Sequence, residues 1–121
     1  MTLEFTIPGL RVVSAANLRE HWRARAARVR KERHNFALGV LAAGVGDQLR
    51  EMAKLNRRLE VTFTRRSPRR LDDDNLASGL KAARDALAAL LGVDDGSDRL
   101  CWHYDQQKGP AGLLVRLEGI G

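Results

Sequence analysis

Short stretches of alternating hydrophobic and polar residues are separated by longer stretches with helical spacing, and this interleaving limits the folds open to the chain. Alternation with a period of two is typical of a strand with one buried face. Such stretches cover residues 2–7, 58–64 and 100–104, and residues 113–117 are expected to form a last strand. The expected order is β-α-β-α-β-β. It predicts a single α/β domain over residues 1–121, with a small mixed sheet and two main helices.

The first helix has a sequence signal at each end. Asn17 and Glu20 are spaced as a capping box, in which the Asn side chain caps the new helix and the Glu side chain reaches back. Gly44 predicts an end at about Ala43. The apolar stripe of this helix would place Trp22 in the core. The following segment, residues 47–55, is consistent with either a short helix or a loop.

Charge is distributed in blocks along a chain whose net charge is +6. Residues 19–33 carry seven basic and two acidic side chains, and residues 57–70 carry six arginines and one glutamate. Residues 72–105 reverse the sign, with eight aspartates and three basic side chains. A basic chain favours an anionic partner, nucleic acid first and an anionic membrane surface second.

The single cysteine, Cys101, excludes an internal disulfide and fits a reducing compartment, so we expect a cytoplasmic protein. The first ten residues have no basic leader and do not resemble a signal peptide. No apolar run approaches the roughly 20 residues of a membrane-spanning helix.

Three consecutive aspartates, Asp72, Asp73 and Asp74, precede a second helix expected over residues 74–91. A negative charge at a helix start contributes about 0.3–1 kcal/mol, and one side chain suffices as the cap. Three adjacent carboxylates repel one another, so capping alone accounts for them poorly. An excess of carboxylates beside cationic blocks favours a site for a hard divalent cation such as Mg²⁺, which takes carboxylate oxygens and leaves room for a phosphate.

A helical wheel of this second helix has an apolar face and, opposite it, a narrow polar stripe that consists of Asp74, Ser78, Lys81 and Asp85. The simpler interpretation of Lys81 and Asp85 is an exposed i, i+4 ion pair worth a few tenths of a kcal/mol. Both interpretations remain open from the residues alone.

The segments Arg69–Leu76, Leu80–Leu87 and Gly92–Asp95 together resemble the RusA family of Holliday-junction resolvases, which are crossover junction endodeoxyribonucleases. The shared features are an arginine-rich lead, an Asp-x-Asp-Asn-Leu motif, a lysine and Asp-Ala-Leu on the next helix, and a Gly turn with paired aspartates. Ser14 and Asn17 fall where that family has a polar loop. About three more residues separate Asn75 from Lys81 than in the family pattern.

The resemblance implies a Mg²⁺-dependent, homodimeric endonuclease that acts on four-way junctions or other branched DNA in recombination and repair, of a type often carried by phages. It assigns catalytic roles to Asp72, Asp74, Asp95 and Lys81, with the three aspartates as metal ligands. The arginines expected to hold backbone phosphates are Arg23, Arg30, Arg65, Arg66, Arg69 and Arg70. The rival interpretation is a non-catalytic, basic nucleic-acid-binding module.

Asp74 and Asp95 flank a helix expected to be about 25 Å long. This length predicts that they can share one ion only if the chain folds back or if a second subunit supplies one of them. Separately, Cys101, His103 and Asp105 share one face of a predicted strand. Two or three ligands on one strand, without a partner cluster, favour ordinary strand side chains over a zinc site.

Overall fold

The computed structural model describes residues 1–12, 19–55 and 57–120 of the 121-residue chain. Its elements are β1 (Thr2–Pro8), α1 (Trp22–Ala43), α2 (Gly46–Lys54), β2 (Arg58–Ser67), α3 (Asp73–Gly79), α4 (Lys81–Leu91), β3 (Leu100–Lys108) and β4 (Gly112–Ile120). The predicted fold class is confirmed. The segment after α1, for which the sequence allows a short helix or a loop, forms the short helix α2, which begins at Gly46.

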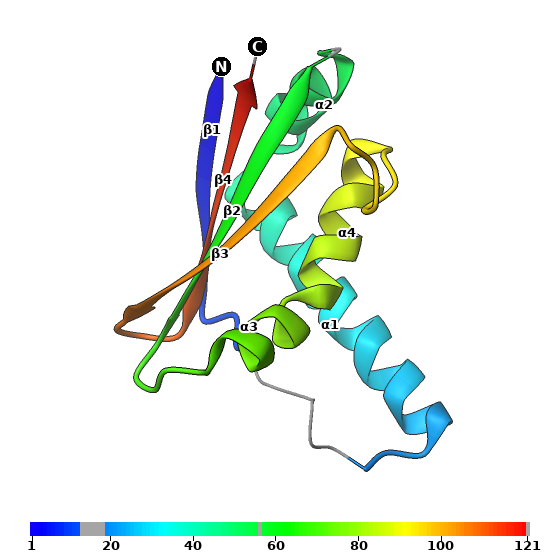
Figure 1. Ribbon diagram of the computed structural model, residues 1–121, viewed down its shortest axis with the longest axis vertical. Helices are drawn as coiled ribbons and strands as arrows, with labels where there is room; N and C mark the ends of the chain where they lie inside the picture. Colours follow the sequence, from blue (N-terminus) through cyan, green and yellow to red (C-terminus); the bar gives the residue numbers. More distant parts are fainter. Residues whose placement is uncertain (13–18, 56, 121) are drawn as a thin grey trace.

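The four strands form one mixed sheet in the order β1-β4-β2-β3. β4 pairs antiparallel with both β1 and β2, and β3 pairs parallel with β2 at the edge. Figure 1 shows that the helices cover one face of the sheet and leave the other uncovered. We call the uncovered face the outer face.

The core lies between the sheet and the helices. The alternating residues of β2, Leu59, Val61 and Phe63, are fully buried, as their spacing predicts. Phe63 stacks on Trp102 of β3, and Phe36 of α1 meets it edge to face. Each aromatic pair of this kind stabilises the fold by about 0.5–1.5 kcal/mol beyond the contribution of the surface area that it buries.

Helix α1 ends at Gly44, as predicted, because Gly44 adopts the left-handed conformation that closes a helix (φ 70°). The predicted start is wrong. His21 is the N-cap, and its ring nitrogen accepts from the backbone N–H of Arg23. Glu20 lies before the helix, where its carboxylate binds the guanidinium of Arg28. Asn17 lies outside the described residues.

The placement of Trp22 in the core is also wrong, because this side chain is 67% exposed. It lies at the end of α1 that extends beyond the sheet in Figure 1. Its partners are the guanidinium of Arg23, 5.1 Å from the ring centre, and the ring of His21.

The second helix is interrupted. Gly79 ends α3, and Leu80 connects it to α4 with φ −93° and ψ −1°. The backbone N–H of Leu80 reaches the carbonyls of both Leu76 and Ser78, and its side chain is fully buried. Leu80 lies in the core with Leu76 and Leu87, the side on which a helical wheel also places it. The wheel drawn through residues 74–85 nevertheless spans the break between α3 and α4.

Candidate functional site

The three aspartates lie at the start of α3 and have different surroundings. Asp72 is the N-cap: one carboxylate oxygen accepts from the backbone N–H of Asn75 at 2.8 Å, and the other accepts from the Asn75 side chain at 3.0 Å. Asp73 and Asp74 occupy the first turn. Both are exposed, and within the described residues neither takes part in an ion pair. Capping thus employs Asp72 and leaves two carboxylates facing solvent.

The segment that leads into these aspartates is fixed by β3. The side chain of Gln106 accepts from the backbone N–H of Leu71 at 2.9 Å and donates to the carbonyl of Leu71 at 2.7 Å. Gln106 is directly opposite Arg65 on the neighbouring strand β2. Sequence analysis did not identify Gln106, because its role depends on the parallel pairing of β2 with β3.

Arg65, for which a contact with DNA phosphates is predicted, also has a structural role. It is only 7% exposed. Its guanidinium donates to the carbonyl of Val12 at 2.9 Å and to the carbonyl of Arg69 at 2.6 Å, and burial lowers its pKa. Arg65 therefore anchors the chain after β1 and the chain after β2, and it also lines both hollows of the basic rim described below.

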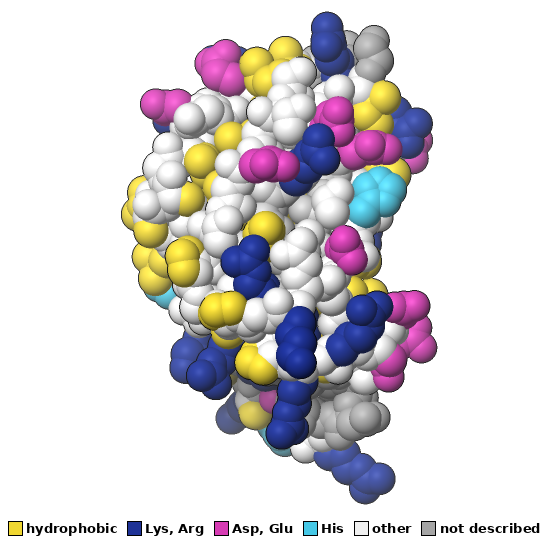
Figure 2. Space-filling view, turned by 90° about the vertical axis from the view of Figure 1, so that its left-hand side faces the viewer, with side chains coloured by type: hydrophobic (Ala, Val, Ile, Leu, Met, Phe, Trp, Pro, Cys, Tyr) yellow, Lys and Arg dark blue, Asp and Glu magenta, His cyan; other side chains and the backbone are white. Residues whose placement is uncertain are grey.

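The other arginines of this region remain accessible. Arg69 and Arg70 are exposed, and with Lys108 they line a hollow of about 320 Å³ at the end of β2 and β3. Arg11 and Arg66 line an adjoining hollow of about 350 Å³. We call these five cations the basic rim. Figure 2 shows Lys and Arg side chains gathered in the lower half of this view, with acidic side chains beside them at its right edge.

Arg23 and Arg30 lie on α1, and both are exposed. Arg23 is held over the ring of Trp22. Both are available to an anionic ligand, but they belong to a helix rather than to the basic rim.

Asp95 lies in the loop that follows α4, and this loop is tied to α4 and β3. Arg84 donates to the main-chain oxygen of Asp95 at 3.2 Å, and the indole N–H of Trp102 donates to the same oxygen at 3.0 Å. The guanidinium of Arg84 also lies over the Trp102 ring, 5.0 Å from its centre, and donates to the hydroxyl of Tyr104. These bonds fold the loop back along α4.

The Asp95 carboxyl has close charged neighbours. Loss of hydration on its own raises the pKa of this carboxyl, but the neighbouring Asp85 and Asp94 side chains and the positive charges of Arg84, at 3.7 Å, and Lys81 outweigh that effect. The pKa of Asp95 therefore lies below its ordinary value of 3.8. Lys81 reaches Asp85 at 3.7 Å. Asp85 of α4 thus has the Lys81 ammonium group as its ion-pair partner and the Asp95 carboxyl as a neighbour.

The three predicted metal ligands are not gathered in one chain. Among the described residues, Asp72, Asp74 and Asp95 do not form a group with all ligand atoms within 4.8 Å of one another. In Figure 1, α3 and the loop after α4 lie toward opposite ends of α4. All three offer carboxylate oxygens, which suit Mg²⁺. Because Asp95 is separated from α3, a single chain supplies at most the α3 carboxylates to one ion.

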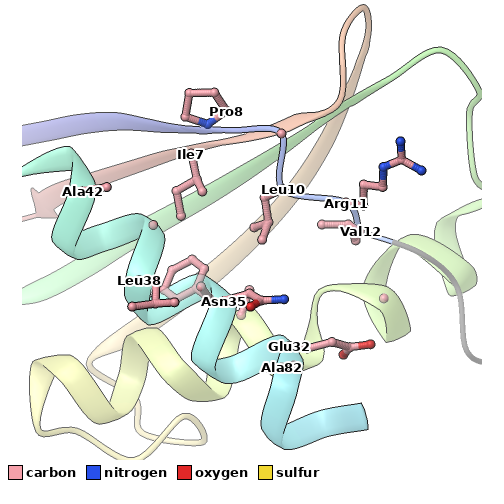
Figure 3. A pocket seen from close by; sticks show the side chains of 15 residues that line it. Ile7, Pro8, Leu10, Arg11, Val12, Glu32, Asn35, Leu38, Ala42 and Ala82 are labelled. Atoms are coloured by element: carbon pink, nitrogen blue, oxygen red, sulfur yellow. The ribbon is translucent and has the colours of Figure 1, made fainter.

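A hollow of about 550 Å³ lies between α1 and the chain after β1 (Figure 3). Ile7 and Leu10 reach toward α1, and Glu32 and Asn35 lie on that helix. Gly39 lets α1 approach β1 here, because a Cβ at this position would fall inside van der Waals contact with the Ile7 side chain. None of the predicted catalytic residues lines this mainly apolar hollow.

No protein-family model matches the chain, and no curated protein matches it. Within the part of the chain that the structure describes, no helix is long and apolar enough to cross a membrane.

Proposed function

We propose that this chain is a Mg²⁺-dependent, structure-selective endonuclease of the RusA type, which cleaves phosphodiester bonds in Holliday junctions or other branched DNA. The proposal includes a cytoplasmic homodimer that serves recombination or repair, of phage or prophage type. One observation carries it: a capping carboxylate and two exposed carboxylates follow Arg69 and Arg70 of the basic rim almost directly in the sequence.

The basic rim supplies the binding part of the activity. Contacts between guanidinium or ammonium groups and backbone phosphates position DNA, are independent of sequence and weaken as salt rises. Arg69 and Arg70 are separated from Asp72 by Leu71 alone, whose backbone Gln106 holds at both polar groups. A phosphate bound at the rim would therefore lie close to the carboxylates.

Asp72 and Asp74 would hold the metal. Mg²⁺ is usually bound through one or two carboxylates together with waters and substrate phosphates, so a pair of aspartates is sufficient. The cap bonds of Asp72 use one acceptor position on each oxygen and leave others free. When bound, the ion would activate a water and offset charge on the scissile phosphate.

Lys81 and Asp95 would act at the same phosphate as the α3 carboxylates. The Lys81 side chain is 71% exposed, and its ammonium group can offset negative charge that develops on a phosphate. Asp95 lies away from α3, so its role as a ligand requires a second subunit. A two-fold dimer would place the Asp95 loop of one subunit against α3 of the other.

The central experiment is cleavage of a four-way junction, with linear duplex as the comparison, in Mg²⁺ or in chelator. We expect paired nicks in the junction only with Mg²⁺, and their loss in Asp74→Asn. Asp47→Asn is the matched control, because Asp47 is also an exposed first-turn aspartate, on α2. Cleavage that survives in Asp74→Asn, or that persists in chelator, contradicts the assignment.

A mixing experiment tests the shared site. Asp74→Asn and Asp95→Asn are each expected to be inactive. Their mixture is expected to regain part of the wild-type cleavage, because each mixed dimer has one intact site. Continued inactivity, with mixed dimers shown to form, counts against sharing.

The alternative function is a non-catalytic module that binds DNA or RNA, or a family member that binds junctions without cutting. The capping role of Asp72 favours it, since that role needs no metal. Binding that is equal in wild type and Asp74→Asn, with no cleavage by either, would support this alternative.

A further inference from the structure

Three potential metal ligands meet on the outer face of the sheet, away from the basic rim. Glu60 of β2 is directly opposite Cys101 of β3, and His103 lies two residues farther along β3 on the same face. The Cys101 Sγ is 3.6 Å from the His103 Nε2, which is 3.7 Å from a carboxylate oxygen of Glu60. Among the described residues, this is the one group of three or more such side chains with all ligand atoms within 4.8 Å.

These spacings fit one tetrahedral ion. Zinc binds sulfur at about 2.3 Å and nitrogen or oxygen at about 2.0–2.2 Å, so two ligands at a tetrahedral angle lie roughly 3.3–3.6 Å apart. The observed 3.6 and 3.7 Å differ from this range by a few tenths of an ångström at most. The third spacing, from the Cys101 Sγ to a Glu60 carboxylate oxygen, is within 4.8 Å, so rotation of these side chains would complete the site.

The ligand types select the metal. Thiolate and imidazole are ligands for zinc and similar transition metals, whereas Mg²⁺ takes oxygen ligands and keeps its waters. The cluster therefore differs in chemistry from the aspartates of α3, and an ion bound here would not replace Mg²⁺ there.

The charges around Glu60 also favour a cation. Glu60 is directly opposite Glu118 across the β2–β4 pair, and like charges in such positions repel each other. Glu118 has the guanidinium of Arg116 at 3.7 Å, which also reaches Glu4 at 3.4 Å. The ion pair that the described residues provide for Glu60 is with His103, which carries charge only when protonated. A metal ion would relieve the repulsion without that proton.

The cluster is accessible, since the His103 and Glu60 side chains are 49% and 42% exposed and no helix formed by the described residues covers the outer face. We propose that Glu60, Cys101 and His103 bind one Zn²⁺ ion per chain, with a water in the fourth position. Three protein ligands and a water form an open zinc site. The proposal does not depend on the nuclease function.

The test uses Co²⁺ as a spectroscopic probe of the whole protein, stripped of metal and kept reduced with a non-chelating phosphine. We expect a thiolate-to-cobalt charge-transfer band that saturates at one ion per chain and disappears when Zn²⁺ is added. Cys101→Ser should abolish the band. His103→Gln should weaken binding by more than the roughly 10–100-fold that loss of a merely supporting residue costs.

Asp105→Asn is the matched control, because Asp105 lies on the same face of β3 two residues beyond His103, and it should bind Co²⁺ as wild type does. Circular dichroism of each variant checks that it is folded. Absence of the band in folded wild type overturns the proposal. So does a band that survives in Cys101→Ser, or saturation at half an ion per chain. Mg²⁺-dependent junction cleavage, measured on the same Cys101→Ser sample, reports separately on the proposed nuclease.

Discussion

Replacement of Gln106 by alanine should loosen the segment that carries the aspartates. The substitution removes two hydrogen bonds to the backbone of Leu71, at 2.9 and 2.7 Å, and a longer one from Arg65 at 3.4 Å. A net hydrogen bond contributes about 0.5–1.5 kcal/mol. Because Leu71 is half-buried and water can replace part of what is lost, we expect a destabilisation of about 1–2 kcal/mol.

Urea unfolding measures this loss. With a slope near 2 kcal/mol per molar, the midpoint should fall by roughly 0.5–1 M. The matched control is Gln107→Ala, since Gln107 is the exposed neighbour and makes one long contact, with Arg66 at 3.4 Å. If the proposed function is right, Gln106→Ala should also lose junction cleavage under conditions where it remains folded, while Gln107→Ala keeps it. A Gln106→Ala protein as stable as the Gln107→Ala control would refute the structural reasoning, whatever its activity.

Three further substitutions test other parts of the fold. Hydrogen bonds from Arg28 hold the pKa of Glu20 below its ordinary value of 4.5, so this pair stabilises the protein above that pH and its contribution is lost as the pH falls through the lowered folded-state pKa. Urea unfolding should therefore find Glu20→Gln less stable than wild type at neutral pH and equal to it in strong acid; an equal difference at both would contradict this. Asp72→Ala should cost about 1 kcal/mol by loss of the α3 cap, and Asp72→Asn much less, so equal losses in thermal unfolding would argue against the cap. Gly39→Ala should cost about 1–3 kcal/mol by overpacking against Ile7, and an unchanged denaturation midpoint would show that α1 can move away.

The strands could be predicted because each has one buried face and carries that pattern in its own residues. β2 is the clearest case, with alternate side chains fully buried against the helices. The end of α1 was predictable for a similar reason, since the left-handed turn at Gly44 needs no information from elsewhere in the chain.

The errors arise where distant residues compete for the same groups. The spacing of Asn17 and Glu20 predicts a capping box, yet the Glu20 carboxylate accepts three contacts from Arg28, two turns into the helix. Trp22 has the right periodicity for the core. However, that end of α1 extends past the sheet, so the sheet offers the Trp22 side chain no surface to pack on. Helical periodicity alone does not reveal whether a partner surface exists.

The break at Leu80 was not predicted. Gly79 weakens a helix by roughly 1 kcal/mol relative to alanine, but a single glycine does not say whether the helix stops there. The burial of Leu80 does not decide it, because an unbroken helix would bury Leu80 on the same face as Leu76.

The candidate site was predictable in its residue types and not in its arrangement. The exposed aspartates and most arginines were identified from their local pattern. Arg65 was assigned to DNA with its neighbours because the strand was predicted to end at residue 64; the alternation of Leu59, Val61 and Phe63 continues to Arg65 and places it on the buried face. Gln106 and Glu60 act through neighbours that are about 35–41 residues away along the chain, and the parallel pairing of β2 with β3 brings them together.

The way in which the loop after α4 is attached has a practical consequence. Arg84 and Trp102 both donate to the main-chain oxygen of Asp95, and these two bonds do not need the Asp95 side chain, whose own ion pair with Arg84 spans 3.7 Å. The side chain at residue 95 can therefore be changed, by mutation or by natural divergence, while these bonds continue to hold the loop backbone. A change of behaviour in such a variant would report on the carboxylate itself.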